Sequence, residues 1–346
     1  MPGDGIGPEI TAATLRVLNA LNQKHDLGLK FVERPIGLAT LASHGSSLPD
    51  EILEEARAAK GVILAPVSTY EYPPVAEGGI NPSATIRVQL DLYANIRPAK
   101  VYAGVPATVK TMDLVVVREN TEGFYADRNM AVGGGEFKPT DDVALSVRKI
   151  TRKGSTRIAR SAFELAMRRR KKVTVVHKAN VLKVTDGFFL ECVREVAGDF
   201  PEVILDESIV DAMTARLIRT PHAFDVVVTT NMFGDILSDE ATELAGGLGL
   251  GGALNAGDGH AIAQATHGSA PDIQGKGIGN PAALMLSAGM LFDWLGSRHS
   301  KPALNEAWIT LERAIENALR DASNRTPDLG GSGTTDGFAS AVAKAI

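Results

Sequence analysis

The chain has 346 residues, of which 44% are hydrophobic and 22% are charged, a composition typical of a folded protein large enough for two domains. Its 36 Lys and Arg and 41 Asp and Glu side chains give a net charge of −5, so no overall positive field would hold it on nucleic acid or on an anionic membrane. No apolar stretch is long enough to span a bilayer and no targeting segment precedes the first glycine-rich turn, so we expect a soluble protein of the cytoplasm.

Short runs rich in Val, Ile and Leu alternate with longer helical patterns along most of the sequence. We interpret these runs as buried strands, because a strand covered on both faces needs no polar alternation. The pattern therefore predicts an α/β fold with a largely parallel sheet. Helix starts are indicated at Pro8 and Pro49, each of which is followed by acidic residues. The predicted strands are 61–64, 113–117, 173–176, 203–205 and 225–228.

Three further segments and the single cysteine bear on the fold. Residues 143–150 predict a half-exposed antiparallel strand or arm, a natural place for a dimer contact. The basic run 168–172 closes a helical stretch, and we prefer a cationic helix end to a polyanion site. The single cysteine, Cys192, suits a reducing compartment and lies in an apolar periodicity that places it in the core. The glycine-rich residues 245–252 indicate either a hinge between domains or tight loops.

Two aspartates four residues apart, Asp235 and Asp239, occur in the segment 231–240. If this segment is helical, both side chains point the same way and offer the hard oxygen ligands that Mg²⁺ or Mn²⁺ prefers. Asp211 is a third candidate ligand upstream. For the pair alone, the alternative is a solvated helix face or a partner of the helix dipole.

Three arginines, Arg87, Arg97 and Arg118, occur in contexts that could bring them together. Because a guanidinium matches the geometry of a carboxylate, they imply a substrate with two or three carboxylates. Each alone could equally be a surface or ion-paired residue. Lys178 directly follows a predicted strand, where α/β folds bind ligands, so it is a candidate acid/base. Its neighbour His177 has no second metal-type partner at useful spacing, and we expect it to be structural.

Six motifs occur along nearly the whole chain: PGDGIGPE (2–9), LDLYANIRP (90–98), RENTEGFY (118–125), HKAN (177–180), NMFGDILSDE (231–240) and HGSAPDI (267–273). In this order they resemble the motifs of the β-decarboxylating dehydrogenases, a family that includes isocitrate, homoisocitrate, 3-isopropylmalate and tartrate/D-malate dehydrogenases. The resemblance implies an isopropylmalate dehydrogenase-like fold, with two α/β domains, a mostly parallel sheet and a cleft between the domains. Residues 1–92 with 246–346 would form a discontinuous NAD-binding domain, and 93–245 a dimerisation and substrate domain.

The resemblance also implies roles for residues at matching motif positions. Three arginines would hold the carboxylates of a 2-hydroxy acid, and three aspartates would bind Mg²⁺ or Mn²⁺, which makes the 2-hydroxyl acidic and later polarises the ketone. Lys178 would help to remove the hydroxyl proton as hydride leaves C2, and Tyr125 would protonate C3 after CO₂ is lost. The arginines are Arg87, Arg97 and Arg118, and the aspartates are Asp211, Asp235 and Asp239. In the family the lysine and the first aspartate reach the site from the second subunit, which implies an obligate homodimer with shared active sites.

The cofactor implied by the resemblance is NAD⁺. The turn 3–7 has neither a preceding strand nor the G-x-G-x-x-G spacing, so a classical Rossmann fold is not expected. Asp272 would accept hydrogen bonds from the ribose hydroxyls and repel a 2′-phosphate, whereas NADP-dependent relatives carry a lysine and a tyrosine in place of Asp272 and Ile273. The expected cofactor-binding residues are Asn180, His267, Gly268, Ser269, Ala270, Asp272, Ile273 and Asn280.

The residues just before Arg87 separate members of the family by substrate. Isopropylmalate enzymes line this wall with leucines and an acid, whereas this chain has Ser83 and Ala84. Asn81 and Ser83 could hydrogen-bond a third carboxylate, which favours isocitrate or a close homologue such as homoisocitrate. The alternatives are 3-isopropylmalate, tartrate and D-malate. A purely structural alternative is that residues 81–83 start a helix with Ser83 as its cap.

The sequence departs from the family pattern at two places, and one alternative to an active enzyme stays open. The apolar strand that usually precedes the Gly-Asp-Gly turn is missing, so either the start is set late or the sheet lacks a strand. Residues 66–70 replace a glycine-rich turn near the nicotinamide, which affects local cofactor contacts. The alternative is a regulatory subunit of a hetero-oligomeric isocitrate dehydrogenase. Such subunits tend to lose the tyrosine, lysine or metal acids, which this chain retains.

Overall fold

The structure, a computed structural model, describes residues 1–125, 130 and 134–346. These residues form two units. The first comprises Met1–Leu90, Tyr102–Thr108 and Gly246–Ile346, and the second comprises Asp91–Val101 and Val109–Ala245. One boundary between them falls in the predicted glycine-rich segment, where φ is 140° at Gly246 and 123° at Gly247. Such values suit glycine, so this segment changes chain direction at a boundary as well as forming loops.

The second unit is built on five strands in the order β2 (Ala94–Lys100), β3 (Asp113–Glu119), β8 (Val226–Thr229), β6 (Lys172–His177) and β7 (Ile204–Ile209). β2 and β3 are antiparallel, and the other three pairings are parallel. The four residues of β8 are all buried, as expected of a strand covered on both faces.

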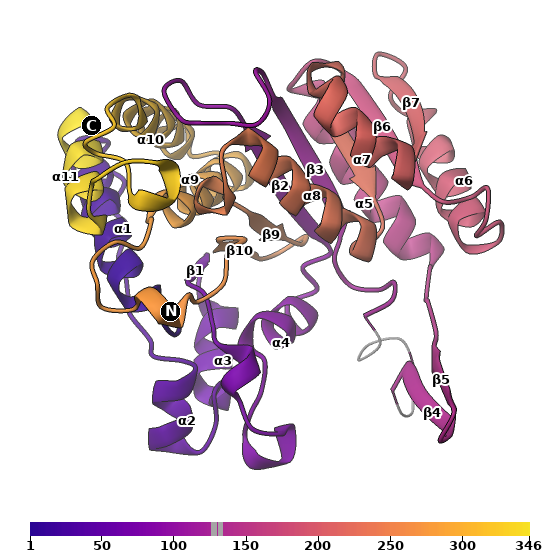
Figure 1. The fold of residues 1–346 in the computed structure, drawn as a ribbon, viewed down its shortest axis with the longest axis horizontal. Helices are drawn as coiled ribbons and strands as arrows, with labels where there is room; N and C mark the ends of the chain where they lie inside the picture. The colour runs from indigo at the N-terminus through magenta and orange to yellow at the C-terminus, as the bar shows by residue number, and fades with distance from the viewer. Residues whose placement is uncertain (126–129, 131–133) are drawn as a thin grey trace. The chain divides into compact units, whose positions relative to one another are not determined.

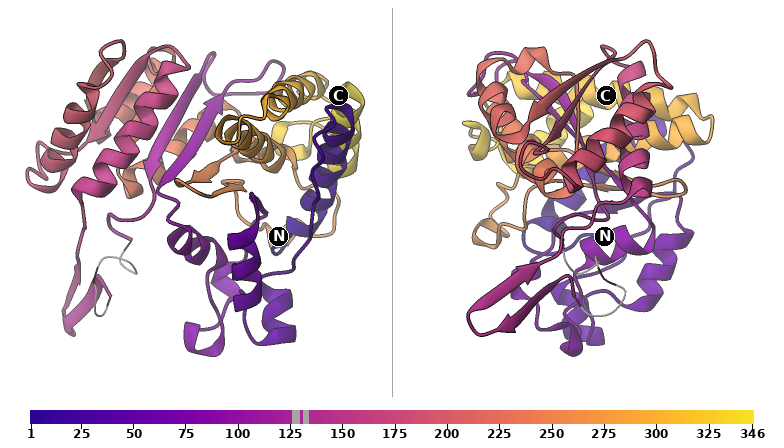
Figure 2. Two further views of the ribbon diagram at one scale, coloured as in Figure 1. Left: turned by 180° about the vertical axis from the view of Figure 1, so that it is seen from behind. Right: turned by 90° about the vertical axis from the view of Figure 1, so that its right-hand side faces the viewer.

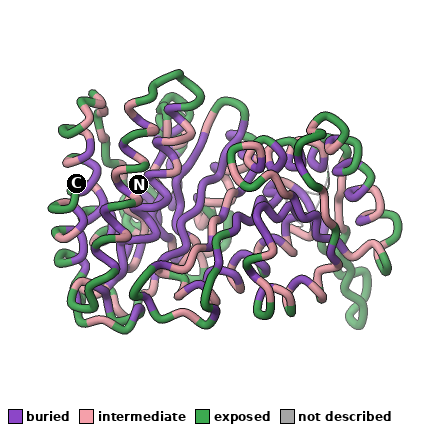
Figure 3. The backbone as a smooth tube through the Cα atoms, turned by 90° about the horizontal axis from the view of Figure 1, so that it is seen from above, coloured by how far each residue is buried: buried purple, intermediate pink, exposed green. Residues whose placement is uncertain are grey.

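Helices cover both faces of this sheet (Figure 1). On one face, α5 (Arg152–Met167) and α6 (Thr185–Ala197) pack against a core that includes Val117 and Phe163. On the other, α7 (Val210–Arg219) and α8 (Asn231–Ala245) pack against a core that includes Val116 and Leu237. Cys192 in α6 is fully buried, which confirms its predicted place in the core. Figure 3 colours the backbone by burial and shows buried residues mainly in the interior of the trace and exposed residues mainly at its outer turns.

A two-stranded antiparallel arm, β4 (Glu136–Thr140) with β5 (Val143–Ser146), extends from the second unit (Figure 2). All residues of both strands are exposed. The sequence predicted a strand or arm over 143–150. The strand ends at Ser146, and Lys149 then forms an isolated bridge with Gly123. That the arm makes a dimer contact stays a prediction.

The first unit contains three strands in the order β1 (Val62–Leu64), β10 (Ala261–Gln264) and β9 (Leu254–Ala256), of which β1 and β10 are parallel. Helix α9 (Ala282–Arg298) lies on β10 and against α10 (Pro302–Arg320). The remaining helices are α1 (Gly7–Lys24), α2 (Leu38–His44), α3 (Asp50–Ala58), α4 (Pro82–Gln89) and α11 (Thr335–Ala345). Short 3-10 turns are η1 (Thr69–Glu71), η2 (Val75–Glu77), η4 (Pro221–Ala223), η5 (Leu248–Leu250), η6 (Pro271–Ile273) and η7 (Pro327–Leu329).

The predicted α/β fold and mostly parallel sheet are confirmed, since each predicted strand overlaps a strand of the structure. The basic run follows α5, as predicted for a cationic helix end, and its side chains are paired with acids. Arg169 contacts Asp113 and Asp225, and Lys171 contacts Glu202. In the parts of the chain that the structure describes, no helix is both long and apolar enough to cross a membrane.

Candidate active site

Helix α8 presents two acidic side chains in the second unit. The predicted helix over 231–240 is confirmed, and Asp235 and Asp239 lie one turn apart on it. Their side chains are 35% and 48% exposed, so solvent and small ligands can reach their oxygens.

Two buried arginines face this helix from the sheet. In the antiparallel register of β2 and β3, Arg97 lies opposite Val116 and Arg118 lies opposite Asn95. The two arginines are therefore diagonal neighbours on one face, the face that carries Val116 towards α8. Their side chains are only 7% and 4% exposed. A Cβ atom at Gly234 would lie 2.6 Å from the Arg118 Cβ, so glycine allows α8 to pass this close.

The two arginines and two aspartates form a balanced cluster of charges. Arg97 Nη1 lies 2.9 Å from Asp239 Oδ1 and 3.2 Å from Asp235 Oδ1, and Arg118 Nη1 also pairs with Asp235 Oδ1. Asn231 Oδ1 accepts hydrogen bonds from Arg118 Nε and Nη2 at 2.9 and 2.7 Å. The cluster thus holds two cationic forks against two accessible carboxylates.

Burial and mutual repulsion shift the protonation equilibria of this cluster. Burial, together with the nearby Arg118 charge, lowers the pKa of Arg97 to about 10, which still leaves it cationic at neutral pH. Burial raises the pKa of Asp239, opposed by the arginines and assisted by the negative charge of Asp235. A cation bound beside Asp239 would therefore favour the ionised form of its carboxyl.

Tyr125 joins the same cluster. Its hydroxyl donates to Asp235 Oδ2 at 2.6 Å, and the Arg118 guanidinium lies 5.4 Å from its ring centroid. Burial and the hydrogen bond to Asp235 raise the pKa of Tyr125, while the positive charge of Arg118 opposes the shift. The structure thus places a proton-bearing phenol beside the acids of α8.

Lys178 follows β6, as the sequence predicted, and pairs with Asp211 at the start of α7. The Lys178 Nζ atom lies 2.5 Å from Asp211 Oδ1. This hydrogen bond from Lys178 lowers the pKa of the Asp211 carboxyl. In this chain Asp211 contacts Lys178 and not the acids of α8. Among residues 1–125, 130 and 134–346, no three His, Cys, Asp or Glu side chains gather as a metal site. A site completed by Asp211 of a second subunit stays a prediction.

The chemistry of the donors nevertheless fits a hard divalent ion. Asp235 and Asp239 supply accessible anionic oxygens from one helix face, the ligand type that Mg²⁺ and Mn²⁺ prefer.

His177 is 7% exposed, and its Nδ1 accepts from the Ala179 amide at 3.0 Å. That contact agrees with the structural role expected of His177.

Arg87 lies in the first unit, on the last turn of α4, and donates to Gln264 Oε1 at 2.8 Å. Ser83 donates to the same oxygen at 3.0 Å. Asn81, not Ser83, caps α4, because its side chain accepts from the Ala84 amide at 3.1 Å. The structural alternative was therefore right about the helix and wrong about its cap. That Arg87 joins the other two arginines in one clamp stays a prediction.

The predicted NAD⁺ loop lies in the first unit between β10 and α9. Ser269 O accepts from the Ile6 amide at 2.8 Å, and Ser269 Oγ accepts from Ser68 Oγ at 2.8 Å. His267 Nδ1 donates to Gly268 O at 3.0 Å, and burial lowers the pKa of the ring, which keeps it neutral. Ala270 has a positive φ of 41°, which bends the loop into η6.

Other predicted cofactor residues differ in exposure. Asp272 is exposed on η6, as a ribose-binding carboxylate requires, and Ile273 is half-buried beside it. Asn280 is buried and its amide already contacts Asp328 Oδ2 at 2.9 Å. Asn180 is exposed in the second unit.

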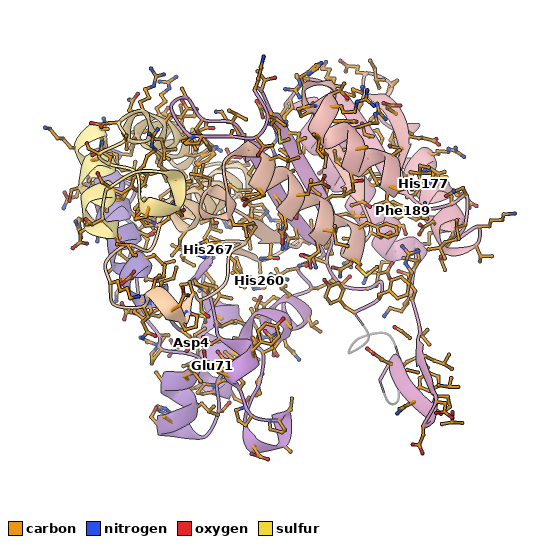
Figure 4. The ribbon with its side chains drawn as sticks, in the orientation of Figure 1. Asp4, Glu71, His177, Phe189, His260 and His267 are labelled. Carbon is orange, nitrogen blue, oxygen red and sulfur yellow. The ribbon has the colours of Figure 1, made fainter. Side chains whose placement is uncertain are left out.

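A buried carboxylate that sequence reasoning did not use, Asp4, supports this loop. Its oxygens accept from the amides of Leu38 and Ser68 at 2.8 and 2.9 Å and from the Tyr72 hydroxyl at 2.5 Å. Figure 4 shows Asp4 and Glu71 labelled in the region of these segments. Through Ser68 and Ser269, the turn 3–7 braces the predicted NAD⁺ loop.

Sequence reasoning also missed the neutral partners of the arginines. Asn231 opens the motif 231–240, and its position at the first residue of α8 was the available signal. Gln264 ends β10, a strand end of the kind that drew attention to Lys178. Asn95 and Ser238, which accept from Arg97 at 3.0 and 2.9 Å, carried no signal of their own.

Comparison with known proteins identifies the family. The sequence profile of the isocitrate/isopropylmalate dehydrogenases matches residues 1–342. The chain is 44% identical over 346 residues to an isocitrate/homoisocitrate dehydrogenase of Thermus thermophilus, covering 99% of this chain and 96% of that one. It is 40% identical over 338 residues to the 3-isopropylmalate dehydrogenase of Sulfurisphaera tokodaii, with coverage of 96% and 94%. The crystal structure of isocitrate dehydrogenase from Methylococcus capsulatus matches with a TM-score of 0.86 and 40% identity, covering 99% of this chain and 97% of that one. The chain therefore belongs to the isocitrate/isopropylmalate dehydrogenase family and is an enzyme, a β-decarboxylating dehydrogenase.

Proposed function

We propose that this enzyme catalyses the NAD⁺-dependent oxidative decarboxylation of a 2-hydroxy-3-carboxy acid, with isocitrate or a close homologue such as homoisocitrate favoured as the substrate. The observation that carries the proposal is the cluster on α8. There, two buried arginines pair with two accessible aspartates beside a protonated tyrosine. Such a cluster can exchange its internal ion pairs for a dicarboxylate and a divalent ion without leaving a buried charge unpaired.

When substrate and metal replace the internal ion pairs, each charged group would take a separate role. Arg97 and Arg118 would turn from the acids of α8 to the carboxylates of the substrate, as their planar forks allow. The released oxygens of Asp235 and Asp239 would hold Mg²⁺ or Mn²⁺. When bound, the divalent ion would acidify the 2-hydroxyl and polarise the ketone, and NAD⁺ would accept hydride from C2.

Two side chains would handle protons. Lys178 would help to remove the proton of the 2-hydroxyl. Tyr125 would deliver a proton to C3 after CO₂ leaves. Its raised pKa keeps the phenol protonated at neutral pH, so the proton is present for transfer to C3.

We propose NAD⁺ rather than NADP⁺ because Asp272 is exposed in the predicted adenosine loop. A carboxylate there would accept from the ribose hydroxyls and repel a 2′-phosphate. The double variant Asp272→Lys with Ile273→Tyr should lower kcat/KM for NAD⁺ at least about tenfold, the size expected for losing a charged hydrogen bond. Glu306→Lys, at an exposed site in α10, makes the same reversal of one charge and is the control. Unchanged use of NAD⁺ by the double variant would mean that the adenosine loop is misassigned.

The preference for a tricarboxylate depends on the start of α4. Asn81 uses its oxygen for the helix cap, so its amide nitrogen remains the donor for a third carboxylate. Ser83 would have to turn its hydroxyl from Gln264 to the substrate. A 3-isopropylmalate activity is the second candidate, favoured by the 40% identity to a relative that carries that name.

We propose that the active form is an obligate homodimer in which Lys178 and Asp211 serve the site of the other subunit. Mixing Lys178→Ala chains with Tyr125→Phe chains, each of which should retain only residual activity, tests this. If sites are shared, random re-pairing after dilution should restore about a quarter of the wild-type activity, because half of the dimers then hold one complete site. Mixtures that stay as inactive as the separate variants would show that each site is built by one chain.

A regulatory subunit without turnover is the alternative from another class, and the cluster of Tyr125 with Asp235 speaks against it. The deciding assay is NADH production by the purified protein alone, with Mn²⁺ and isocitrate, homoisocitrate, 3-isopropylmalate, D-malate or tartrate. We expect the highest kcat/KM with isocitrate or homoisocitrate. Activity with none of the five acids would overturn the proposed function and favour a binding subunit.

A further inference from the structure

We propose that the buried ion pair of Arg148 and Asp186 is a positioning device for catalysis, which fixes the backbone of Lys178 relative to the segments that carry Tyr125 and Asp235. The inference rests on the proposed function, because it assumes that Lys178 serves the site of the other subunit while Tyr125 and Asp235 serve the site of their own chain. The pair would then hold the two parts of each chain that enter the reaction in a fixed relation. Neither Arg148 nor Asp186 belongs to the motifs that identified the family.

Asp186 anchors the Lys178 segment. Its side chain is 0% exposed and lies in the first turn of α6. One carboxylate oxygen accepts from the backbone amide of Lys178 at 2.6 Å, and the other pairs with Arg148 Nη1. The hydrogen bond from the Lys178 amide is charge-assisted and its acceptor is fully buried, so it fixes where the chain leaves β6 and where the Lys178 side chain starts.

Arg148 connects this anchor to the segment of α8. Its Nη2 donates to Thr230 Oγ1 at 3.0 Å. The carbonyl of Thr230 in turn accepts from the Gly234 amide at 2.9 Å, in the first turn of the helix that carries Asp235. A displacement of Arg148 would therefore reach the start of α8.

Two aromatic rings contact the guanidinium of Arg148. Its central carbon lies 5.3 Å from the ring centroid of Phe124 and 5.2 Å from that of Phe233. Phe124 precedes Tyr125 in the chain, and Phe233 lies two residues before Asp235. Cation–π contacts with two rings help to hold this guanidinium in place. Arg148 thus contacts the segments of Tyr125 and Asp235 directly and is connected to the segment of Lys178 through Asp186.

The plain alternative is that the pair only stabilises the fold. The second unit contains a matched case, the pair of Arg169 and Asp225. The Asp225 side chain is 1% exposed, accepts from Arg169 Nε at 2.7 Å, and accepts from the backbone amide of Arg170 at 2.8 Å. Asp225 precedes β8 and Thr230 follows it, so the two pairs lie at opposite ends of the same strand. If each buried ion pair only stabilised the fold, substitution of either aspartate should have the same effect on stability and on kcat.

The test compares Asp186→Asn with Asp225→Asn in the full-length protein. Asparagine keeps the shape but removes the charge and points an amide donor at the arginine. We expect both variants to lower the thermal midpoint to a similar extent. Asp186→Asn should also lower kcat at least tenfold while the KM values for NAD⁺ and the acid change less than threefold, because misplacement affects the reaction more than binding. Asp225→Asn should leave kcat within twofold of wild type.

A second measurement follows the anchor without using activity. Hydrogen exchange of the Lys178 amide should accelerate about tenfold in Asp186→Asn and stay unchanged in Asp225→Asn, because only the first loses the charged acceptor. Thr230→Val is a milder probe that removes one acceptor of Arg148, and it should lower kcat severalfold. It replaces Asp186→Asn in the kinetic test if that variant does not fold.

Two results would overturn the inference. One is a kcat of Asp186→Asn, or of Thr230→Val in its place, within twofold of wild type; the other is an equal loss of kcat in Asp225→Asn. If wild-type protein turned over none of the acids, the proposed function would fail on its own. Exchange at the Lys178 amide would then still decide whether Asp186 anchors that segment, and an unchanged rate would reject it.

Discussion

Asp235 and Asp239 in the second unit and Asp4 in the first unit have opposite roles, although all three carry the same side chain. In the second unit, Asp235 and Asp239 are partly exposed and pair with side-chain guanidiniums. In the first unit, Asp4 is 5% exposed and two of its three donors are backbone amides. A guanidinium on a flexible stem can turn to another anion, whereas an amide fixed in a loop cannot.

The difference shows that partner type, more than residue type, separates a reactive carboxylate from a structural one. Ion pairs among side chains can be replaced by ligand contacts at little net cost when both partners find new ones. Bonds to amides in a braced turn are lost only if the turn opens. We therefore expect changes at Asp235 and Asp239 to affect turnover, and changes at Asp4 to affect cofactor affinity and stability.

The largest effect should come from Lys178→Ala. Removal of an acid/base group typically costs 10²–10⁴-fold in rate, and we expect a loss of about 10³-fold in kcat. Its pair with Asp211 is partly exposed, so the free energy of unfolding should change by less than about 1 kcal/mol. Lys183→Ala, an exposed lysine nearby, is the control and should retain full activity. Turnover by Lys178→Ala within tenfold of wild type would remove Lys178 from the reaction.

The next effect should come from Asp235→Asn, which keeps the shape of the side chain and removes its charge. We expect kcat/KM to fall at least about a hundredfold, since a divalent ion contributes several kcal/mol to such a reaction. Binding of Mn²⁺, followed by its electron paramagnetic resonance signal, should weaken in parallel. Glu240→Gln removes the neighbouring acid of α8 and should leave Mn²⁺ affinity unchanged. If both variants bind Mn²⁺ like the wild type, Asp235 is not a ligand.

A smaller and different effect is expected at Asp4. Asp4→Asn weakens charge-assisted bonds to amides, which should cost about 1.5–3 kcal/mol of unfolding free energy. Because the turn 3–7 braces Ser269, we also expect KM for NAD⁺ to rise about tenfold with kcat little changed. Asp50→Asn, at the exposed start of α3, serves as the control. A fall in kcat at constant KM for NAD⁺ would mean that Asp4, like Asp235, affects turnover and not cofactor affinity.

The proposed reacting residues of the second unit could be predicted from the sequence, because their placement depends on local periodicity. The four-residue spacing of Asp235 and Asp239 fixed their common direction once the segment formed a helix. Lys178 stood out because it follows a Val-rich strand, and strand ends are where α/β folds present ligands.

The supporting side could not be predicted, because its contacts join residues far apart in the chain. Asp4 accepts from amides at positions 38 and 68, and any residue type supplies such an amide. Arg148 and Asp186 are 38 positions apart, and neither lies in a recognisable motif. The cap of α4 was assigned to Ser83 instead of Asn81 because both residue types are common caps, and only the geometry separates them.

The smallest expected effect is an absence of pH dependence at Tyr125. Its pKa is raised from the ordinary value of 10.0, so the phenol keeps its proton through the neutral and mildly alkaline range. Between pH 7 and 9.5, the kcat of wild type should therefore not fall because of Tyr125. The pH profiles of wild type and Tyr125→Phe should have the same shape over this range. Stability should respond only at higher pH. Above about pH 10 the unfolded phenol ionises before the folded one, so the unfolding free energy of wild type should drop relative to Tyr125→Phe. A Tyr125-dependent limb below pH 9 would mean that the positive charges of the arginines, and not burial, control the pKa of this phenol.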